Sequence, residues 1–186
     1  ERRIAAGRYP KGGSVASIFV SRWDVAVKDP VPPALHNQLG LAIAQRTYRA
    51  YRELLASARW RKLADAGAQA QRLLWASTGT KDPAAPDTLY LQALAAPDTI
   101  NTIPEKTLFA FADHGKVSGS MAADGAACED TLAAFARAGV DDAALASRLQ
   151  QEGAESFTKS WSDLMAVIAS KSAALAKGQS NAKGQS

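Results

Sequence analysis

Lys81 ends a short stretch whose residue types suit the binding of an anion. The segment LLWASTGTK, residues 73–81, passes from four apolar residues into Ser, Thr, Gly, Thr and Lys. Hydroxyl groups, backbone N–H groups freed by Gly79 and one ammonium make a plausible phosphate cradle. The spacing GxxxxGK[ST] is absent, so the segment is not a P-loop. The residues alone leave Lys81 open as a nucleophile, a phosphate ligand or a solvated lysine.

Arg22 belongs to a second polar group, which gathers at the end of the apolar segment SVASIFVS with Ser17, Ser21 and Asp24. The guanidinium is a planar fork of donors that matches a phosphate. An equally open alternative is that Arg22 pairs with Asp24 or caps a helix.

Asn101 and Thr102 are the polar residues of a third such segment, DTINTI. Asn101 either faces a ligand or fills the interior of a sheet layer. Thr102 is better explained as a helix cap, because Glu105 follows three residues later, as in a capping box. Both histidines are isolated, without a nucleophile pattern or a second ligand at i+4, which argues against catalytic and zinc roles.

The three polar groups follow three segments with the composition of short buried strands, at residues 14–21, 72–77 and 98–103. Each is a compact run of β-branched, Leu or aromatic residues, and helical patterns separate them. Parallel strands with helical crossovers are therefore expected, which is an α/β fold. Three strands cannot close a barrel and would leave edges unpaired, so part of the sheet is expected to be absent from this chain.

The helical segments follow from apolar spacing and from Pro and Gly boundaries. They are expected at residues 34–57, 58–67, 105–115, 126–138, 141–152 and 154–176. The last stripe, from Phe157 to Ile168, is predicted to be core packing. The repeat AKGQS near the C-terminus has no apolar face and predicts a disordered tail or linker.

Composition sets further limits on the function. The 186 residues are 47% apolar and 22% charged, with a net charge of +4 spread along the chain. That pattern fits a phosphorylated small molecule at least as well as nucleic acid, and scattered tryptophans offer no stacking platform. The single Cys128 excludes an internal disulfide and indicates a reducing compartment. Without a long apolar run or a signal peptide, a cytoplasmic protein is expected. The opening ERRIAAGRYP suggests a piece of a longer protein.

Five ordered motifs resemble the C-terminal part of transaldolase, in the branch found in actinobacteria, cyanobacteria and plants that includes transaldolase fused to glucose-6-phosphate isomerase. They are ASIFVSRWD, LAIAQRTYRAYRELL, RWRKLADAGAQAQRLLWASTGTKDP, DTLYLQALAAPDTINTIPEKTLFAFADHG and EGAESFTKSWSDLM. The resemblance covers nearly the whole chain except the repeated tail. It implies a (β/α)8 TIM barrel represented by strands six to eight with additional C-terminal helices, over residues 1–175, followed by a low-complexity tail at 176–186.

The resemblance also implies a function in the pentose phosphate pathway. Transaldolases transfer a dihydroxyacetone unit between ketose and aldose phosphates through a lysine Schiff base, without a metal or organic cofactor. The sugar phosphates are fructose 6-phosphate, sedoheptulose 7-phosphate, erythrose 4-phosphate and glyceraldehyde 3-phosphate; neither nucleic acid nor a membrane is an expected partner. The family's lysine lies in a motif close to I-K-I-P-A-T, which does not occur here. This chain alone is therefore expected to be inactive.

The resemblance assigns the site residues as ligands of substrate and phosphate: Ser17, Phe19, Arg22, Ser77 and Lys81. It makes Lys81 a phosphate ligand, not the Schiff-base lysine. One departure is that many transaldolases carry an Arg shortly after the seventh-strand Ser, so the role of Lys81 requires the loop to fold back. The alternative is a non-catalytic phosphosugar-binding half, or the second subunit of a split enzyme that assembles with an N-terminal half of the barrel.

Overall fold

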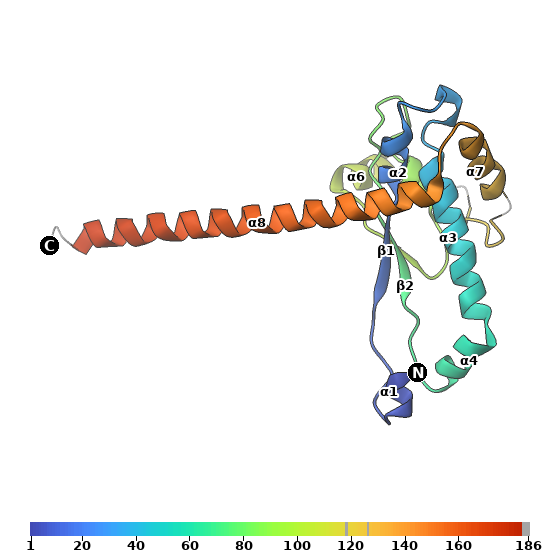
Figure 1. The fold of residues 1–186 in the computed structure, drawn as a ribbon, viewed down its shortest axis with the longest axis horizontal. Helices are drawn as coiled ribbons and strands as arrows, with labels where there is room; N and C mark the ends of the chain where they lie inside the picture. The colour runs from blue at the N-terminus through green and yellow to red at the C-terminus, as the bar shows by residue number, and fades with distance from the viewer. Residues whose placement is uncertain (118, 126, 184–186) are drawn as a thin grey trace. The chain divides into compact units, whose positions relative to one another are not determined.

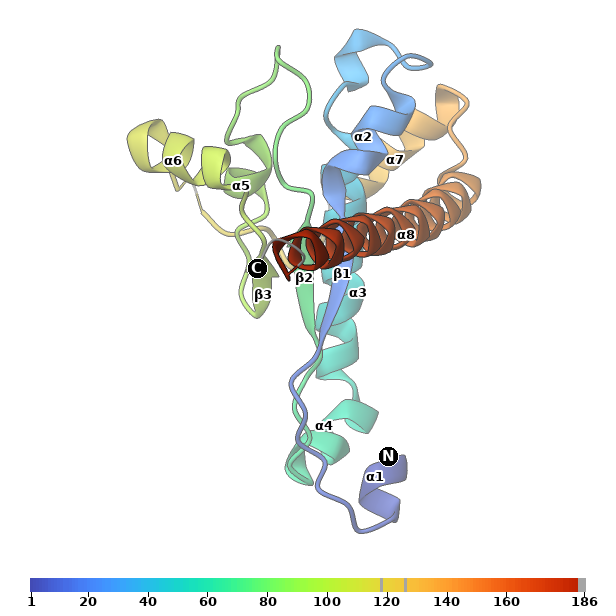
Figure 2. The same ribbon diagram turned by 90° about the vertical axis from the view of Figure 1, so that its left-hand side faces the viewer.

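A three-stranded parallel sheet forms the centre of the N-terminal part of the chain. The computed structural model describes residues 1–117, 119–125 and 127–183. The strands β1 (Val15–Phe19), β2 (Arg72–Ala76) and β3 (Thr99–Asn101) lie side by side in sequence order. Both pairings are parallel, with Phe19 opposite Ala76 and Trp75 opposite Asn101. Figure 2 draws the three strands side by side. The predicted strands, their parallel direction and the α/β class are confirmed, although each strand is shorter than expected.

One face of this sheet carries the hydrophobic core. Successive strand residues point to opposite faces, so Ile18, Leu73 and Trp75 share one side of the sheet. Trp75 is completely buried and packs in a cluster with Tyr48 and Tyr90 from flanking helices. The other face bears Ser17, Leu74 and Ile100, of which Ser17 is exposed and the other two are half-buried.

Helices connect and flank the strands. They are α1 (Arg2–Ala5), α2 (Val20–Val27), the 3-10 turn η1 (Pro33–Leu35), α3 (Leu39–Ala56), α4 (Ala58–Asp65), α5 (Leu89–Ala93), α6 (Glu105–His114) and α7 (Cys128–Arg137). The longest of them, α3, runs beside β1 and β2 in both views (Figures 1 and 2). Its buried positions recur at helical spacing, as the sequence predicts, and contribute Ala44, Tyr48 and Tyr51 to the core.

Two boundaries differ from the sequence-based expectation. The first strand ends at Phe19, and Val20 already begins α2, so Arg22 is a helical residue. The expected capping box at Thr102 is wrong. The Thr102 backbone N–H and hydroxyl both donate to the Trp75 carbonyl, at 2.9 and 3.0 Å, and Pro104 precedes the first helical residue, Glu105.

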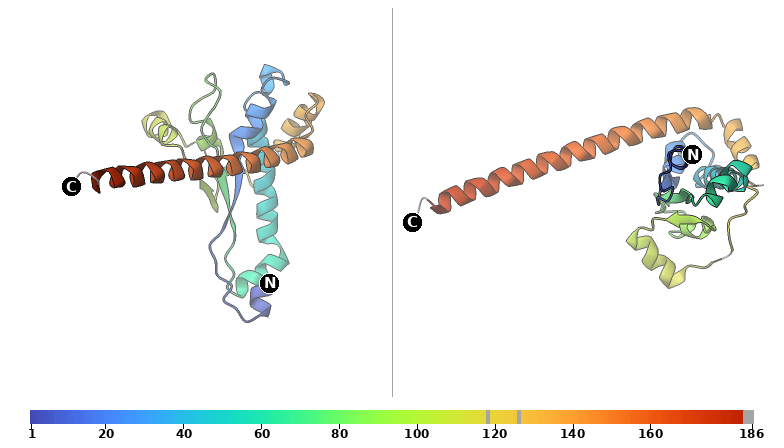
Figure 3. Two further views of the ribbon diagram at one scale, coloured as in Figure 1. Left: turned by 60° about the vertical axis from the view of Figure 1, so that its left-hand side comes forward. Right: turned by 90° about the horizontal axis from the view of Figure 1, so that it is seen from below.

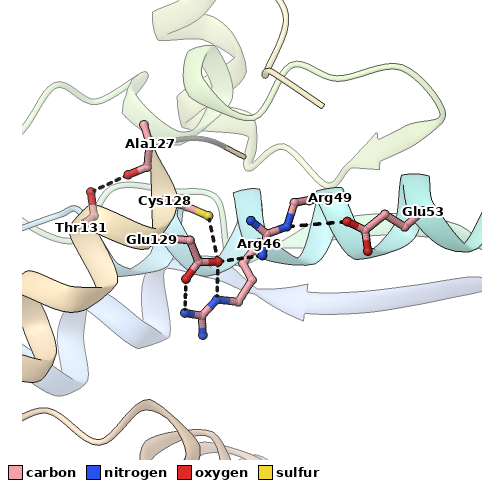
Figure 4. A network of polar contacts seen from close by, with 7 residues as sticks. All are labelled: Arg46, Arg49, Glu53, Ala127, Cys128, Glu129 and Thr131. Atoms are coloured by element: carbon pink, nitrogen blue, oxygen red, sulfur yellow. Dashed lines mark hydrogen bonds and ion pairs between the residues drawn. The ribbon is translucent and has the colours of Figure 1, made fainter. Parts of the chain in front are cut away.

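The glutamate of α7 attaches that helix to α3 (Figure 4). Glu129 accepts hydrogen bonds from Arg46 and from Arg49, each at 2.7 Å for the shortest nitrogen to oxygen distance. These bonds lower the pKa of Glu129 from 4.5 to about 2. The charge cluster holds α7 against α3.

A single helix, α8 (Asp142–Lys183), forms a compact unit separate from residues 1–141. It replaces the two helices expected at 141–152 and 154–176, because Gly153 alone is a weak break among good helix formers. Figure 3 draws α8 as one continuous helix. The ion pairs Arg148–Glu152 and Lys159–Asp163 support it at i,i+4 spacing. It continues over residues 176–183, where a disordered tail was expected, and residues 184–186 lie outside the described residues. No helix among the described residues is long and apolar enough to cross a membrane.

Candidate functional site

Arg22 lies at the carboxyl end of the sheet, in the first turn of α2. Its guanidinium carbon is 4.4 Å from the centre of the Phe19 ring, which is a cation–π distance. Within the described part of the chain, Arg22 forms no ion pair, so the alternative pairing with Asp24 is not observed. The half-buried Arg22 side chain therefore combines a fixed stacking partner with an unneutralised charge.

Ser77 is joined to the start of α2. The Ser21 backbone N–H donates to the Ser77 carbonyl at 3.1 Å, and the two hydroxyl oxygens are 2.7 Å apart. Because Phe19 and Ala76 are register partners, the residues that follow them emerge next to each other. Ser77 has φ +55°, in the left-handed region that non-glycine residues rarely adopt. The strand end is thus turned sharply, and its serine is placed against the arginine-bearing helix.

Asp24 points into the protein instead of toward Arg22. It is 5% exposed, and its carboxylate accepts a hydrogen bond from the Gly40 backbone N–H at 3.1 Å and from the Tyr90 hydroxyl at 2.7 Å. Gly40 lies in the first turn of α3, whose N-cap residue Gln38 makes no side-chain cap. Burial raises the pKa of Asp24, against the lowering effect of these hydrogen bonds. Asp24 consequently serves as a long-range cap for α3.

Lys81 lies in the loop after β2, beside a cavity of about 200 Å³ that is also lined by Lys28, Asp82 and Tyr90. Its side chain is exposed, and no hydrogen bond or ion pair joins it to Ser77, Arg22 or another described residue. The neighbouring Asp82 accepts from Asn37 Nδ2 at 2.9 Å and lies 3.4 Å from Lys28 Nζ. The hydrogen bond from Asn37 is the main cause of a lowered Asp82 pKa. The structure therefore brings Lys81 to this cavity, not into contact with the two serines.

Thr78 joins the end of β2 to the end of β3 by hydrogen bonds. Its hydroxyl, on a side chain that is 1% exposed, lies 2.8 Å from Asn101 Oδ1 and 2.9 Å from the Thr102 carbonyl, and is the donor to both. Asn101 shares the core-facing side of the sheet with Trp75. Of its two possible roles, the interior polar residue is the one observed. Gly79 is also buried, and a Cβ there would lie 3.2 Å from Pro104 Cγ.

Most of the strand-end residues lie close to one another, and Lys81 lies apart from them. Ser17 and Phe19 share the face of β1 opposite the core, since they are two residues apart. Phe19, Arg22 and Ser77 form the connected group, through the ring contact and the Ser21 bridge. An arginine, serine hydroxyls and an exposed strand face provide donors for an anion and a surface for a small polar molecule.

Comparison with known proteins gives this geometry its context. The family described as Transaldolase/Fructose-6-phosphate aldolase matches residues 2–168. This chain belongs to that family. It is 44% identical to the transaldolase of Frankia alni over 180 residues, which is 91% of this chain and 48% of the relative. It is also 44% identical to transaldolase 1 of Streptomyces avermitilis over 178 residues, covering 91% and 47%. The chain thus spans about half the length of these relatives.

The remaining titratable candidates do not join the strand-end group. His114 contacts Asp87 at 2.9 Å through Nε2 and Asp113 at 3.2 Å through Nδ1, and both bonds raise its pKa. Cys128 is buried, which raises the pKa of its thiol. Among the described residues, no group of three His, Cys, Asp or Glu side chains could hold a metal ion.

Sequence reasoning did not find the partners of Asp24. Tyr90 is separated from Asp24 by 66 residues, and an aromatic residue in a short helix is usually ordinary core. Likewise, nothing in the sequence around Gly40, in the first turn of α3, indicates that its backbone N–H donates to Asp24. The only available hint was a single Asp within the apolar segment WDVAV, because a carboxylate that such a segment buries needs hydrogen-bond donors.

Proposed function

We propose that this chain forms the phosphate-binding side of a transaldolase active site, with β1, β2 and β3 as strands six, seven and eight of a (β/α)8 barrel. The parallel order of the strands and the family match over residues 2–168 support this assignment. In such barrels, ligands bind at the carboxyl ends of the strands. Arg22 and Ser77 follow β1 and β2 at those ends.

The observation that carries the proposal is the guanidinium of Arg22 stacked on Phe19 without an ion pair among the described residues. An arginine fixed by an aromatic ring keeps its fork of donors oriented, so less conformational entropy is lost when a phosphate binds. A surface arginine with a structural role would instead be expected to contact a carboxylate. Arg22 is therefore the principal phosphate ligand of this proposal.

The other strand-end residues take supporting roles. The Ser77 hydroxyl donates to a phosphate oxygen while its bridge to Ser21 keeps it against α2. Ser17 and Phe19 contact the sugar, since they share the face of β1 opposite the core. Lys81 adds a weaker point charge, which reaches the phosphate once the loop after β2 folds toward Ser77. Its exposed side chain leaves it free for that movement.

The reaction assigned to the complete protein is transfer of a dihydroxyacetone unit from a ketose phosphate such as fructose 6-phosphate to an aldose phosphate such as erythrose 4-phosphate. A lysine outside this sequence condenses with the ketose carbonyl, with loss of water, and the protonated Schiff base serves as the electron sink for carbon–carbon cleavage. The present residues hold the phosphate at the far end of the substrate. That binding places the carbonyl near the lysine and contributes by orientation.

The second candidate is a split enzyme. In that case this chain would be a phosphosugar-binding subunit that assembles with a separate half of the barrel. An upstream reading frame encoding the remaining strands would support the split form. Co-expression of the two halves, followed by co-purification, distinguishes it from an isolated binding protein.

The test uses a hybrid enzyme, in which the part of the Frankia alni transaldolase that this chain does not match is joined to this chain. Arg22→Ala should raise the KM for fructose 6-phosphate roughly 10- to 100-fold, because a charge-assisted contact contributes about 1.5–3 kcal/mol. The kcat should change little, since the contact exists in both ground state and transition state. Turnover of unphosphorylated fructose should stay at its original level.

Two further variants control this experiment. Arg61→Ala removes an exposed arginine of α4 and should leave both KM values unchanged. Arg22→Lys keeps the charge without the fork and should recover part of the affinity. Equal loss of turnover with fructose and fructose 6-phosphate in Arg22→Ala would make Arg22 a structural residue and reject the phosphate assignment.

A further inference from the structure

The side chains of Arg22 and Asp24 project from opposite sides of the short helix α2. Successive residues of an α-helix are about 100° apart, so two residues turn the direction by about 200°. Asp24 is 5% exposed and faces the interior, while Arg22 stacks on Phe19 at the strand end. Rotation of α2 about its axis at Asp24 would therefore swing the guanidinium of Arg22 by the same angle.

The helix α2 cannot fix its own orientation. It has eight residues, and a helix of this length is marginal without tertiary contacts. Asp24 supplies such contacts to two other elements. Oδ1 accepts from the Gly40 N–H of α3, at 3.1 Å, and Oδ2 accepts from the Tyr90 hydroxyl of α5, at 2.7 Å.

The helices α2 and α3 approach each other closely at Gly40, where Asp24 accepts its hydrogen bond. A Cβ at Gly40 would lie 2.5 Å from the Val20 carbonyl oxygen and 2.6 Å from Asp24 Oδ2. Real Cβ atoms essentially never come so close, so the absence of a side chain is what lets α2 lie against the start of α3. Oδ1 of the carboxylate accepts from the backbone of α3, and Oδ2 accepts from a side chain of α5.

The Tyr90 hydroxyl holds that second oxygen from within the core. Tyr90 is 1% exposed and follows the loop that carries Lys81. We propose that Asp24 and Tyr90 are positioning residues for the phosphate site: their hydrogen bond sets the rotation of α2 and so holds Arg22 over Phe19. This inference rests on the function proposed above, because it assigns the phosphate to Arg22.

Removing the hydrogen bond between Tyr90 and Asp24 should leave Arg22 less well preorganised for binding phosphate. Tyr90→Phe keeps the ring and its packing but deletes the donor to Asp24 Oδ2. The hydrogen bonds to Ser77 and Gly40 still hold α2, but the helix loses its hydrogen bond to α5. Arg22 is then held less firmly before phosphate binds. The phosphate affinity should fall while the chemical step at the other end of the sugar is unaffected.

The test compares two buried tyrosines in the hybrid enzyme. Tyr90→Phe should raise the KM for fructose 6-phosphate by about 3- to 10-fold, the range of one hydrogen bond, without lowering kcat or turnover of fructose. Tyr48→Phe is the matched control, since Tyr48 is also 1% exposed and its hydroxyl donates to the Pro97 carbonyl at 3.2 Å, away from α2. It should leave both KM values unchanged.

A double variant separates the two proposals. If Tyr90 acts through Arg22, then Tyr90→Phe combined with Arg22→Ala should raise the KM no further than Arg22→Ala alone. Additive effects would overturn the positioning role while leaving the phosphate assignment in place. If Arg22→Ala itself left the KM for fructose 6-phosphate unchanged, the proposed function would fail, and the positioning role with it.

A second measurement needs no activity and uses this chain as it stands. The order parameter of the Arg22 side-chain Nε–H, from NMR relaxation, should fall in Tyr90→Phe and keep its original value in Tyr48→Phe. Asp24→Asn, which keeps one acceptor oxygen, should lower it less than Asp24→Ala. An Arg22 order parameter that is the same in Tyr90→Phe and in the parent chain would contradict the inference.

Discussion

Replacing Gly40 by Ala tests the contact between α2 and α3 on which the strand-end site depends. The added Cβ would lie 2.5 Å from the Val20 carbonyl oxygen and 2.6 Å from Asp24 Oδ2. The first of these atoms belongs to the backbone of α2, so the clash cannot be relieved by turning a flexible side chain. The two helices must separate, and the hydrogen bond from the residue-40 N–H to Asp24 must lengthen.

Two opposing terms set the size of the effect. Overpacking of a close contact costs about 1–3 kcal/mol. Ala gains at most about 1 kcal/mol over Gly in helix propensity, and less than this in the first turn. The free energy of unfolding should therefore fall by about 1–2 kcal/mol, which corresponds to a fall in Tm of about 2–8 °C for a chain of this size.

The assay is urea unfolding of the Gly40→Ala chain beside Gly12→Ala. Gly12 lies in a loop, a Cβ added there would meet no heavy atom within 4 Å, and its φ is not left-handed. Gly12→Ala should therefore be neutral or stabilising by up to about 1 kcal/mol. A Gly40→Ala chain as stable as its parent would show that α2 does not pack on α3 as closely as the structure has it.

Two other changes test the bonds that hold the strand ends and α7. Thr78→Val deletes a buried hydroxyl that serves two acceptors, and it should lower the free energy of unfolding in urea by about 1–2 kcal/mol. Thr131→Val, at a half-buried position of α7, should lower it by less than about 0.5 kcal/mol. Equal losses in the two variants would contradict the importance of the buried Thr78 hydroxyl. The lowered Glu129 pKa stabilises the fold above pH 4.5, and that contribution is lost as the pH falls toward about 2. Glu129→Gln should flatten this part of the stability profile, whereas Glu53→Gln, with one contact at 3.9 Å, should not.

Local signals in the sequence account for the elements that were predicted correctly. The apolar runs before Arg22 and Ser77 are short and bounded by polar residues, which is enough to place parallel strands between helices. The spacing of Tyr48 and Tyr51 with their apolar neighbours likewise predicts α3. These patterns depend only on residues close in sequence, so no knowledge of packing is needed.

The errors lie where tertiary contacts decide. Val20 suits a strand by its β-branched side chain, yet the backbone bond between Ser21 and Ser77 favours a helix beginning there. Thr102 is a residue type that often caps helices, but its hydroxyl donates a hydrogen bond to the Trp75 carbonyl of the neighbouring strand. Both partners are distant in sequence and leave no local pattern.

The candidate site shows the same division. The positions of Arg22 and Ser77 near each other were predictable, because side chains that follow neighbouring parallel strands meet at one end of the sheet. The isolation of Lys81 from them was not, since a loop of this length can fold either way. The hydrogen bond between Asp24 and Tyr90 joins residues 66 positions apart, and only the folded chain reveals it.

Borohydride trapping tests most directly the claim that this chain binds the substrate phosphate but does not carry the nucleophile. The hybrid enzyme, reduced with borohydride in the presence of fructose 6-phosphate, should acquire one covalent adduct on a peptide outside this chain. The chain alone, treated in the same way, should show no adduct by peptide mass spectrometry. An adduct on Lys81, or on any other lysine of this chain, would contradict the account and make the loop after β2 the seat of the chemistry.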